Sequence, residues 1–181
     1  MKHSATYIAL FIVLFASQAN AQQEPMYSQY YFNNSVINPA QAGALGANEV
    51  GVLVRTQWLG INGAPQTLSA YGNFILPKQL GIAVGLYQDQ VGVETNQHLQ
   101  ADLSYHLRLV ENWYLSGGLR VIASHYKADF SQVPNVDPNN PAFQTDYSSG
   151  LLVNTGFGFL AYNGKTFIGA SMPKAFTRVV G

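Results

Sequence analysis

Apolar and polar side chains alternate with a period of two along most of the chain after residue 48. In residues 49–58 the even positions carry valine, threonine or tryptophan, whereas the odd positions are mostly polar or small. Successive side chains of a β-strand point to opposite faces, so this pattern predicts a strand with one apolar and one mostly polar face. No helical stripe of useful length follows, and the same alternation sets the pattern for the rest of the chain.

Further strands are predicted by the same alternation, separated by turn signals. Short turns are expected at Pro77-Lys78, Glu111-Asn112 and Asn163-Gly164, the last being a strong hairpin signal. The pair Gly117-Gly118 allows a bend or a close approach within its strand. Longer polar connections are expected at residues 60–66, 90–97 and 127–148. The predicted strands after the first are residues 67–76, 80–88, 98–108, 113–126, 149–162 and 166–172. We therefore expect an all-β protein with about seven strands.

The lengths and composition of these strands favour a transmembrane antiparallel β-barrel. Several are 9–14 residues long, and a tilted membrane strand needs about 9–11. Charged residues make up only 10% of the chain, against about 25% in a soluble domain. Uncharged polar residues and glycine fill the difference, which suits a wall with lipid outside and a polar interior. The alternative is a soluble β-sandwich, which has the same alternation but shorter strands and more lysine and glutamate on its wet face.

The alternation of short and longer connections predicts an orientation. Outer-membrane barrels have short periplasmic turns and long external loops, so the N-terminus would lie in the periplasm and the three longer connections outside. Aromatic residues near strand ends are expected at the membrane interfaces, namely Trp58, Phe74, Tyr87, Trp113 and Tyr126.

An odd number of strands argues against a complete barrel. Closed single-chain bacterial barrels have even counts, and an open sheet edge in lipid would leave backbone groups unpaired. We therefore expect an incomplete half of a larger barrel, either a truncated piece or a sheet whose edges pair with another chain. Truncation is favoured, because residues 178–181 do not resemble a terminal aromatic strand.

Three segments are expected along the chain. Residues 1–21 have the pattern of a secretory signal peptide, with Lys2, an apolar run at 7–16 and a cleavage pattern ending at Ala21. The alternative is an N-terminal anchor helix. Residues 22–48 form a plug-like periplasmic lead-in, extended or briefly helical, in which the residue before Pro39 avoids the helical region. Residues 49–181 form the partial barrel.

Several short pieces occur in a set order between residues 29 and 67. They contain Gln29, Tyr30, Phe32, Asn33, Asn38, Pro39, Ala40, Ala42, Gly43, Arg55, Gln57, Trp58, Gly63, Pro65 and Thr67. In this order the pieces resemble the PorP/SprF family of type IX secretion system outer-membrane proteins. Gln41 and Tyr31 depart mildly from the family pattern, and family members are usually longer, with more strands.

The resemblance implies a non-enzymatic function in type IX secretion. Such proteins support the export or surface attachment of adhesins and gliding machinery. Their implied partners are secreted cargo at the cell surface, periplasmic secretion-system components and outer-membrane lipid. Residues 22–48 would tuck into the periplasmic end of the barrel and the external loops would face cargo. A passive pore and an outer-membrane hydrolase are the alternative functions. The formal net charge is zero, so nothing favours a nucleic-acid partner.

Asp102, Ser104 and His106 share one strand face and are the candidates for a hydrolase. Residues two apart on a strand are about 6.6–6.8 Å apart at the backbone, whereas a triad needs side-chain contacts of about 2.6–3.2 Å. Because three positions in a line do not converge easily, we interpret them as polar lumen lining.

Metal and cofactor sites have little support in the sequence. His98 and His106 would lie roughly 26 Å apart along a strand, His125 is on the next strand, and there is no cysteine. Residues 135–140 offer oxygen ligands without the spacing of a calcium loop, so an external loop is the better interpretation. We expect neither a metal nor a cofactor.

Arg55 lies on the polar face of its strand and would need a partner inside a barrel wall. Glu49 and Asp102 are the expected structural partners, and a direct contact with a secretion partner is the alternative. With Gln57 and Trp58, Arg55 would lock the first strand to the interior. Gly63 and Pro65 would shape the first external loop.

Overall fold

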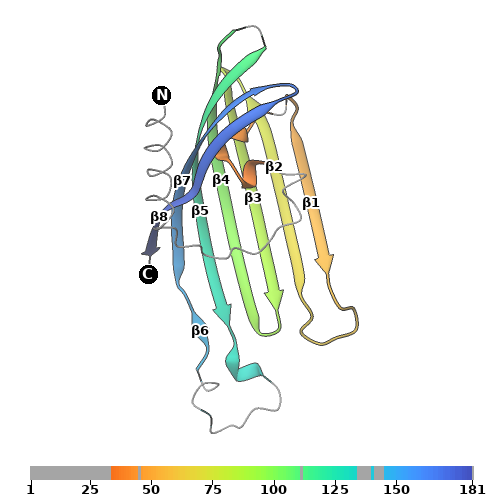
Figure 1. Cartoon of the computed structure of the whole chain (residues 1–181). Coiled ribbons are helices and arrows are strands. Elements are labelled where there is room, and N and C mark those ends of the chain that lie inside the picture. The colour runs from red at the N-terminus through yellow and green to blue at the C-terminus, as the bar shows by residue number, and fades with distance from the viewer. Residues whose placement is uncertain (1–33, 45, 111, 134–139, 141–144, 181) are drawn as a thin grey trace, which may run out of the picture.

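The computed structural model describes residues 34–44, 46–110, 112–133, 140 and 145–180. In this part of the chain, long strands form one antiparallel sheet in which successive long strands are neighbours (Figure 1). A two-residue strand, β6 (Tyr147–Ser148), pairs with the end of β5. The long strands are β1 (Glu49–Thr56), β2 (Gln66–Leu76), β3 (Leu80–Val91), β4 (Glu94–Arg108), β5 (Trp113–Ala128), β7 (Leu151–Asn163) and β8 (Phe167–Val180). The prediction of an all-β chain with about seven strands is confirmed.

The sheet is curved but not closed. Its strand order runs from β1 to β8, and these two edge strands do not pair with each other. Figure 1 shows the sheet curling so that β8 comes forward over the concave side. The open curve agrees with the expected incomplete barrel. None of the helical segments in the described ranges has the length and apolar character to cross a bilayer.

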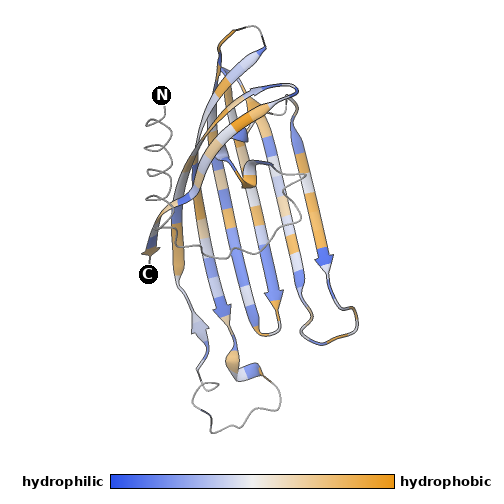
Figure 2. Cartoon of the chain, in the orientation of Figure 1, coloured by the Kyte–Doolittle hydropathy of each residue, from blue (hydrophilic) through white to orange (hydrophobic). Residues whose placement is uncertain are grey.

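The two faces of the sheet have opposite character, as the alternation predicted. On the convex face, Leu103 lies opposite Leu119, which lies opposite Phe157, and all three are exposed. Figure 2 shows the apolar and polar bands alternating along each strand. The concave face carries the buried polar residues, including Asp102 and Arg120. A soluble sandwich would bury its apolar faces, so this arrangement contradicts that alternative and fits a wall facing lipid.

Residues 34–44 lie against the concave face, and we call them the plug segment. They form two 3₁₀ turns, η2 (Asn34–Val36) and η3 (Pro39–Gln41). The second packs against β4, β5 and β7, in the position that Figure 1 shows inside the curve of the sheet. The expected short helical lead-in therefore forms in these residues. The predicted signal peptide and the matches at Gln29 and Tyr30 lie outside the described residues.

The prediction of a loop at residues 90–97 is wrong. Strand β3 continues to Val91 and β4 begins at Glu94, so only Gly92 and Val93 separate them. The two strands stay paired along their backbones up to Val91 and Glu94, and polar side chains also bond across them, as Gln97 Nε2 does to Gln88 Oε1 at 3.0 Å. The strict alternation of short and long connections consequently fails at this turn.

Other strand ends also shift from their predicted places. β5 extends to Ala128, which shortens the expected 127–148 connection, and β8 extends to Val180 rather than ending at 172. The last hairpin turns at Gly164-Lys165, one residue later than predicted, because Asn163 N donates to Thr166 O at 2.9 Å. The Asn163 side chain accepts the Thr166 N–H within the same turn.

Candidate functional site

The side chain of Asn38 stabilises the second turn of the plug segment. The Asn38 backbone is extended, with φ −139° and ψ 114°, as expected for a residue before proline. Its side-chain Oδ1 accepts a hydrogen bond from Ala40 N at 2.9 Å and so caps η3. Its Nδ2 donates to Phe159 O on β7 at 3.0 Å. One side chain therefore shapes the plug segment and ties it to the wall.

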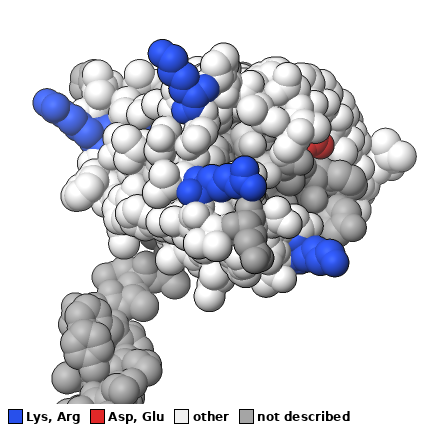
Figure 3. Space-filling model, turned by 90° about the horizontal axis from the view of Figure 1, so that it is seen from above, with Lys and Arg blue, Asp and Glu red and all other residues white. Residues whose placement is uncertain are grey.

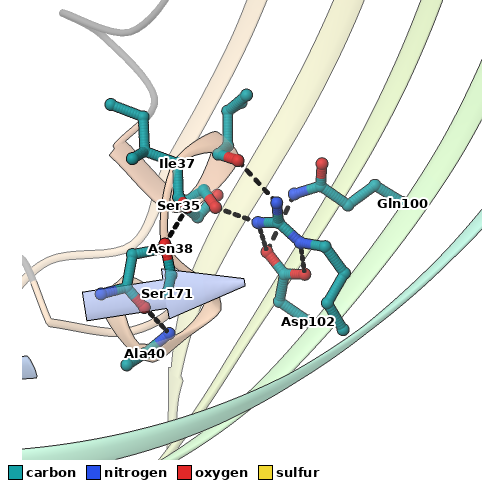
Figure 4. Close-up of polar contacts among 9 residues, drawn as sticks. Ser35, Ile37, Asn38, Ala40, Gln100, Asp102 and Ser171 are labelled. Atoms are coloured by element: carbon teal, nitrogen blue, oxygen red, sulfur yellow. Dashed lines mark hydrogen bonds and ion pairs between the residues drawn. The ribbon is translucent and has the colours of Figure 1, made fainter. Parts of the chain in front are cut away.

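Arg120 on β5 joins the plug segment to β4. Figure 4 shows Ser35 of the plug segment with Gln100 and Asp102 of β4 around this contact. Its Nε and Nη2 atoms donate to the two carboxylate oxygens of Asp102, at 2.7 Å each. Its Nη1 donates to Val36 O at 2.5 Å, and Nη2 also donates to Ser35 O. Gln100 Nε2 donates to the same carboxylate at 2.8 Å. The guanidinium thus connects a carboxylate of the wall with two carbonyls of the plug segment.

Burial makes this ion pair energetically important. The side chains of Arg120 and Asp102 are only 2% and 0% exposed. A buried charge is tolerated when it is paired and its remaining hydrogen bonds are satisfied, and here the plug carbonyls complete the set. Removing the plug segment would leave guanidinium donors without acceptors in the wall. The pair therefore favours the plugged state.

A second polar cluster fixes the other end of the plug segment at Ala42. The Ala42 carbonyl accepts from Ser104 Oγ at 2.5 Å and from His106 Nε2 at 2.7 Å. On the far side of the imidazole ring, Tyr162 OH bonds to His106 Nδ1 at 3.0 Å. In addition, Asn73 Oδ1 accepts from Gly43 N at 2.6 Å. Three strands, β2, β4 and β7, therefore contribute to holding residues 42 and 43.

Small residues let the plug segment approach the wall closely. A Cβ atom added at Gly118 would overlap the backbone of Pro39 and Ala40, and one at Gly81 would overlap the Ala42 carbonyl. Beside Gly118, Ser116 Oγ donates to Ala40 O at 2.8 Å. The predicted close approach at Gly117-Gly118 is therefore confirmed at Gly118, where the approaching chain is the plug segment.

The hydrolase candidates lie under the plug segment. Ser104 and His106 do meet, with Ser104 Oγ 2.9 Å from His106 Nε2, so the expectation that these positions stay apart is wrong for this pair. However, the Ala42 carbonyl can only accept, so the proton of the neutral imidazole must be on Nε2. That nitrogen cannot accept the serine proton, and Asp102 is bound by Arg120. The arrangement is that of a structural contact and not of a nucleophile with its base.

The other two histidines in the described part of the chain have separate partners. His98 Nδ1 lies 2.9 Å from Ser124 Oγ, and His125 Nε2 lies 3.0 Å from Ser148 Oγ. No group of three potential ligands among histidine, aspartate and glutamate forms within the described ranges.

The family-like residues separate into two places. Asn38, Pro39 and Gly43 meet in the plug segment, where Gly43 adopts a φ of 72°. Arg55 to Thr67 lie around the opposite end of the sheet, in and beside the β1–β2 connection. There, Thr67 Oγ1 donates to Asp89 Oδ1 at 2.6 Å.

The β1–β2 connection, residues 57–65, forms a structured loop. Gln57 N donates to Pro65 O at 3.0 Å and closes its base, while Gly63 O accepts from Gly92 N at 2.9 Å. Gly63 has a φ of 76°. This geometry agrees with the expectation that Gly63 and Pro65 shape the loop. Trp58, in contrast, is 67% exposed, so it does not lock β1 to the interior as predicted.

The two partners that the sequence suggested for Arg55 are bound by other residues. Asp102 gives both carboxylate oxygens to Arg120, and Glu49 accepts from Tyr71 OH at 3.1 Å. Glu49 is also six residues away, about 20 Å along the strand. Sequence reasoning missed Arg120 as the partner of Asp102, because only the register of β4 and β5 places the two residues directly opposite each other.

Two of the aromatic residues that were predicted at the membrane interface lie on the concave face instead. Tyr87 is only 9% exposed and lies on the concave face, in ring contact with His98 at 5.9 Å between centroids. Tyr126 shares that face. Trp113 is exposed on the convex face near the end of the sheet, as predicted, and is joined there by Tyr105.

A curved antiparallel wall, apolar outside and filled on its concave side by a polar-bonded plug segment, defines a membrane protein of the β-barrel class. A family model described as type IX secretion system membrane protein PorP/SprF matches residues 19–180. The chain therefore belongs to the PorP/SprF family, as the resemblance implied. No curated protein sequence and no solved structure matches it.

Proposed function

We propose that this chain is a non-enzymatic outer-membrane component of type IX secretion that supports export or surface attachment of secreted proteins, including adhesins and gliding machinery. The observation that carries the proposal is the family match over residues 19–180, together with the location of Asn38 and Pro39 in the plug segment. A wall with its interior filled by its own chain suits a scaffold for partners better than a site for chemistry.

The orientation supports a division of partners between the two ends. We assign the end with the turns after β2, β4 and β7 to the periplasm, because the two long connections, residues 57–65 and 129–146, are both at the other end and such barrels have long external loops. The plug segment would then enter from the periplasmic side, where residues 22–48 would meet secretion-system components. The β1–β2 connection and the β5–β6 connection, residues 129–146, would face secreted cargo outside.

The base of the β5–β6 connection is ordered by hydrogen bonds. Ser131 donates to Asp146 from its backbone N at 3.0 Å and from its Oγ at 3.1 Å. These bonds stabilise the carboxylate and hold the pKa of Asp146 below its ordinary value. This ordered base supports a role of the connection in contacting a partner.

The test replaces residues 132–145 with a short Gly-Ser linker in cells that otherwise lack the protein. We expect normal amounts of the protein in the outer membrane but loss of labelled cargo from the cell surface. A matched control replaces Gly164 and Lys165 in the opposite hairpin and should retain cargo. Full cargo attachment with the shortened loop would contradict the assignment of this loop, and full attachment in cells lacking the protein altogether would contradict the function.

A passive pore is the second candidate, favoured by the polar concave face. It predicts conductance in planar bilayers by the protein with its plug segment in place. The bonds from Arg120, Ser104 and His106 to the plug segment instead support a blocked interior. Conductance that appears only when Arg120 is replaced would support the scaffold over the pore.

A further inference from the structure

The wall holds the plug segment mainly through the backbone of that segment. Ser171 Oγ on β8 donates to Ile37 O at 2.8 Å, and Figure 4 shows Ser171 close to Ile37 and Asn38. With this contact, wall side chains donate to the plug carbonyls at positions 35, 36, 37, 40 and 42. The donors are Arg120, Ser171, Ser116, Ser104 and His106. Every residue has a backbone carbonyl, so these bonds do not require the particular side chains of this segment.

The wall also selects small side chains at two positions of the plug segment. Ala40 and Ala42 are both 0% exposed. The backbone at these positions lies against Gly118 and Gly81, where not even an added Cβ atom has space. Ile37, in contrast, is 48% exposed. The surface therefore recognises acceptor carbonyls and small residues at alternate positions, and it tolerates variation elsewhere.

An empty surface would be unfavourable. Ser104, Ser116 and Arg120 are 1%, 0% and 2% exposed, and a buried donor that loses its acceptor destabilises a protein. Another segment with carbonyls at the same positions would restore these bonds and the packing on Gly81 and Gly118 together. The plug segment is therefore easier to replace by a similar segment than to remove.

Charge sets a further limit on a replacing segment. Residues 34–44 contain no charged side chain, and the buried Arg120 is already paired with Asp102. Figure 3, which looks onto the short-turn end of the sheet, shows mostly uncharged surface with separate basic side chains and little acidic surface. A segment that reaches the concave face from this end should be uncharged, because a further charge would be buried beside a pair that is already balanced.

We propose that the concave face beneath the plug segment binds a short segment of a partner protein in place of the plug segment. The partner segment is uncharged and turn-forming, with small residues at two alternate positions, as Ala40 and Ala42 provide here. The plug segment acts as an internal competitor, with a high effective concentration because it belongs to the same chain. This inference rests on the proposed function, because it describes the chemistry of one of the partners.

Chemical capture with the full chain in detergent micelles tests this exchange. The probe is a synthetic peptide with the sequence of residues 34–44 and a bromoacetyl group at its residue 37, which forms a thioether with a nearby cysteine. The native chain has no cysteine, so Ser171→Cys provides a single thiol next to the position of Ile37. The matched control is Ser131→Cys, at an exposed serine near the other end of the sheet. Both rates are divided by the rates with free bromoacetamide.

We expect the peptide to modify Ser171→Cys at least about tenfold faster than Ser131→Cys, because binding raises its local concentration. Asn38→Ala in the chain weakens the internal competitor and should raise capture at Ser171→Cys by about fivefold or more. Ala40→Leu in the peptide should lower capture by about tenfold, since this position has no space for a larger side chain. Gln41→Ala in the peptide should change capture by less than about twofold.

Three outcomes would overturn the inference. They are equal normalised rates at the two cysteines, no capture at either cysteine, and unchanged capture with the Ala40→Leu peptide. None of them would contradict the proposed function, which is tested separately by the surface attachment of cargo in cells.

Discussion

Arg120 and Asp102 lie opposite each other on β5 and β4 and form a buried, two-point ion pair whose guanidinium also bonds to two carbonyls of the plug segment. This relationship connects the wall to the segment that fills it. The pair lies on the polar, concave face, and the leucines of the same two strands point to the opposite, convex face. The plug segment is therefore part of the folded wall rather than an appendage.

Replacing Arg120 by glutamine should destabilise the protein by about 3–5 kcal/mol, because the Asp102 carboxylate would remain buried without its partner. The measurement is urea unfolding in detergent micelles, followed by tryptophan fluorescence. Arg178→Gln, on exposed β8, is the matched control and should change stability by less than about 0.5 kcal/mol. The combined change Arg120→Met with Asp102→Leu should cost less than Arg120→Gln alone, and an equal or larger cost would contradict the role of the buried carboxylate.

Gly118→Ala should displace the plug segment, whereas the neighbouring Gly117→Ala should not. A Cβ at Gly118 would overlap Pro39 and Ala40, but one at Gly117 would lie 3.8 Å from Phe159, an ordinary contact. The native chain has no cysteine, so a Ser35→Cys reporter can be labelled alone with a water-soluble maleimide. Labelling should be at least about tenfold faster with Gly118→Ala. Equal labelling rates of the Ser35→Cys reporter in the two alanine variants would contradict the close approach of the plug segment to Gly118.

Asn38→Ala should cost about 1–3 kcal/mol, because it removes the cap on Ala40 N and the donor to Phe159 O, leaving buried groups unpaired. Asn38→Asp keeps the cap but also loses the donor, so it should be destabilising too. Asn48, an exposed asparagine that accepts from Ile75 N, is the control, and Asn48→Ala should be nearly neutral in the same unfolding assay. Wild-type stability of Asn38→Asp would show that the bond to Phe159 is unimportant.

The alternation of side chains was enough to predict the strands and their faces, because successive side chains of a strand point to opposite faces in any environment. It failed where both faces are polar. Residues 94–97 are polar on both faces, so they resemble a loop, yet the backbone ladder and the Gln88–Gln97 bond continue the pairing of β3 and β4 through them. Backbone pairing needs no apolar side chain, and strand ends beyond the lipid are therefore hard to recognise from hydropathy.

The polar contacts of the plug segment were only partly predictable. Proline at 39 indicated an extended Asn38, and the glycine pair indicated a close approach, since both follow from local backbone geometry. The pairing of Asp102 with Arg120 depends on the exact register of β4 and β5, and the contact of Ser104 with His106 depends on a third group, the Ala42 carbonyl, to which both bond. Such long-range contacts leave no periodic signal in the sequence.

The central claim is that the apolar face of this wall meets lipid and the polar face meets the plug segment. Single cysteines at positions 98 to 107 of β4, each carrying a nitroxide, would be compared in bilayers for collision with oxygen and with a water-soluble nickel chelate. We predict that oxygen dominates at Leu99, Ala101, Leu103, Tyr105 and Leu107, and falls at every position between them. Low oxygen accessibility at the leucine positions, or no alternation along the strand, would contradict the account.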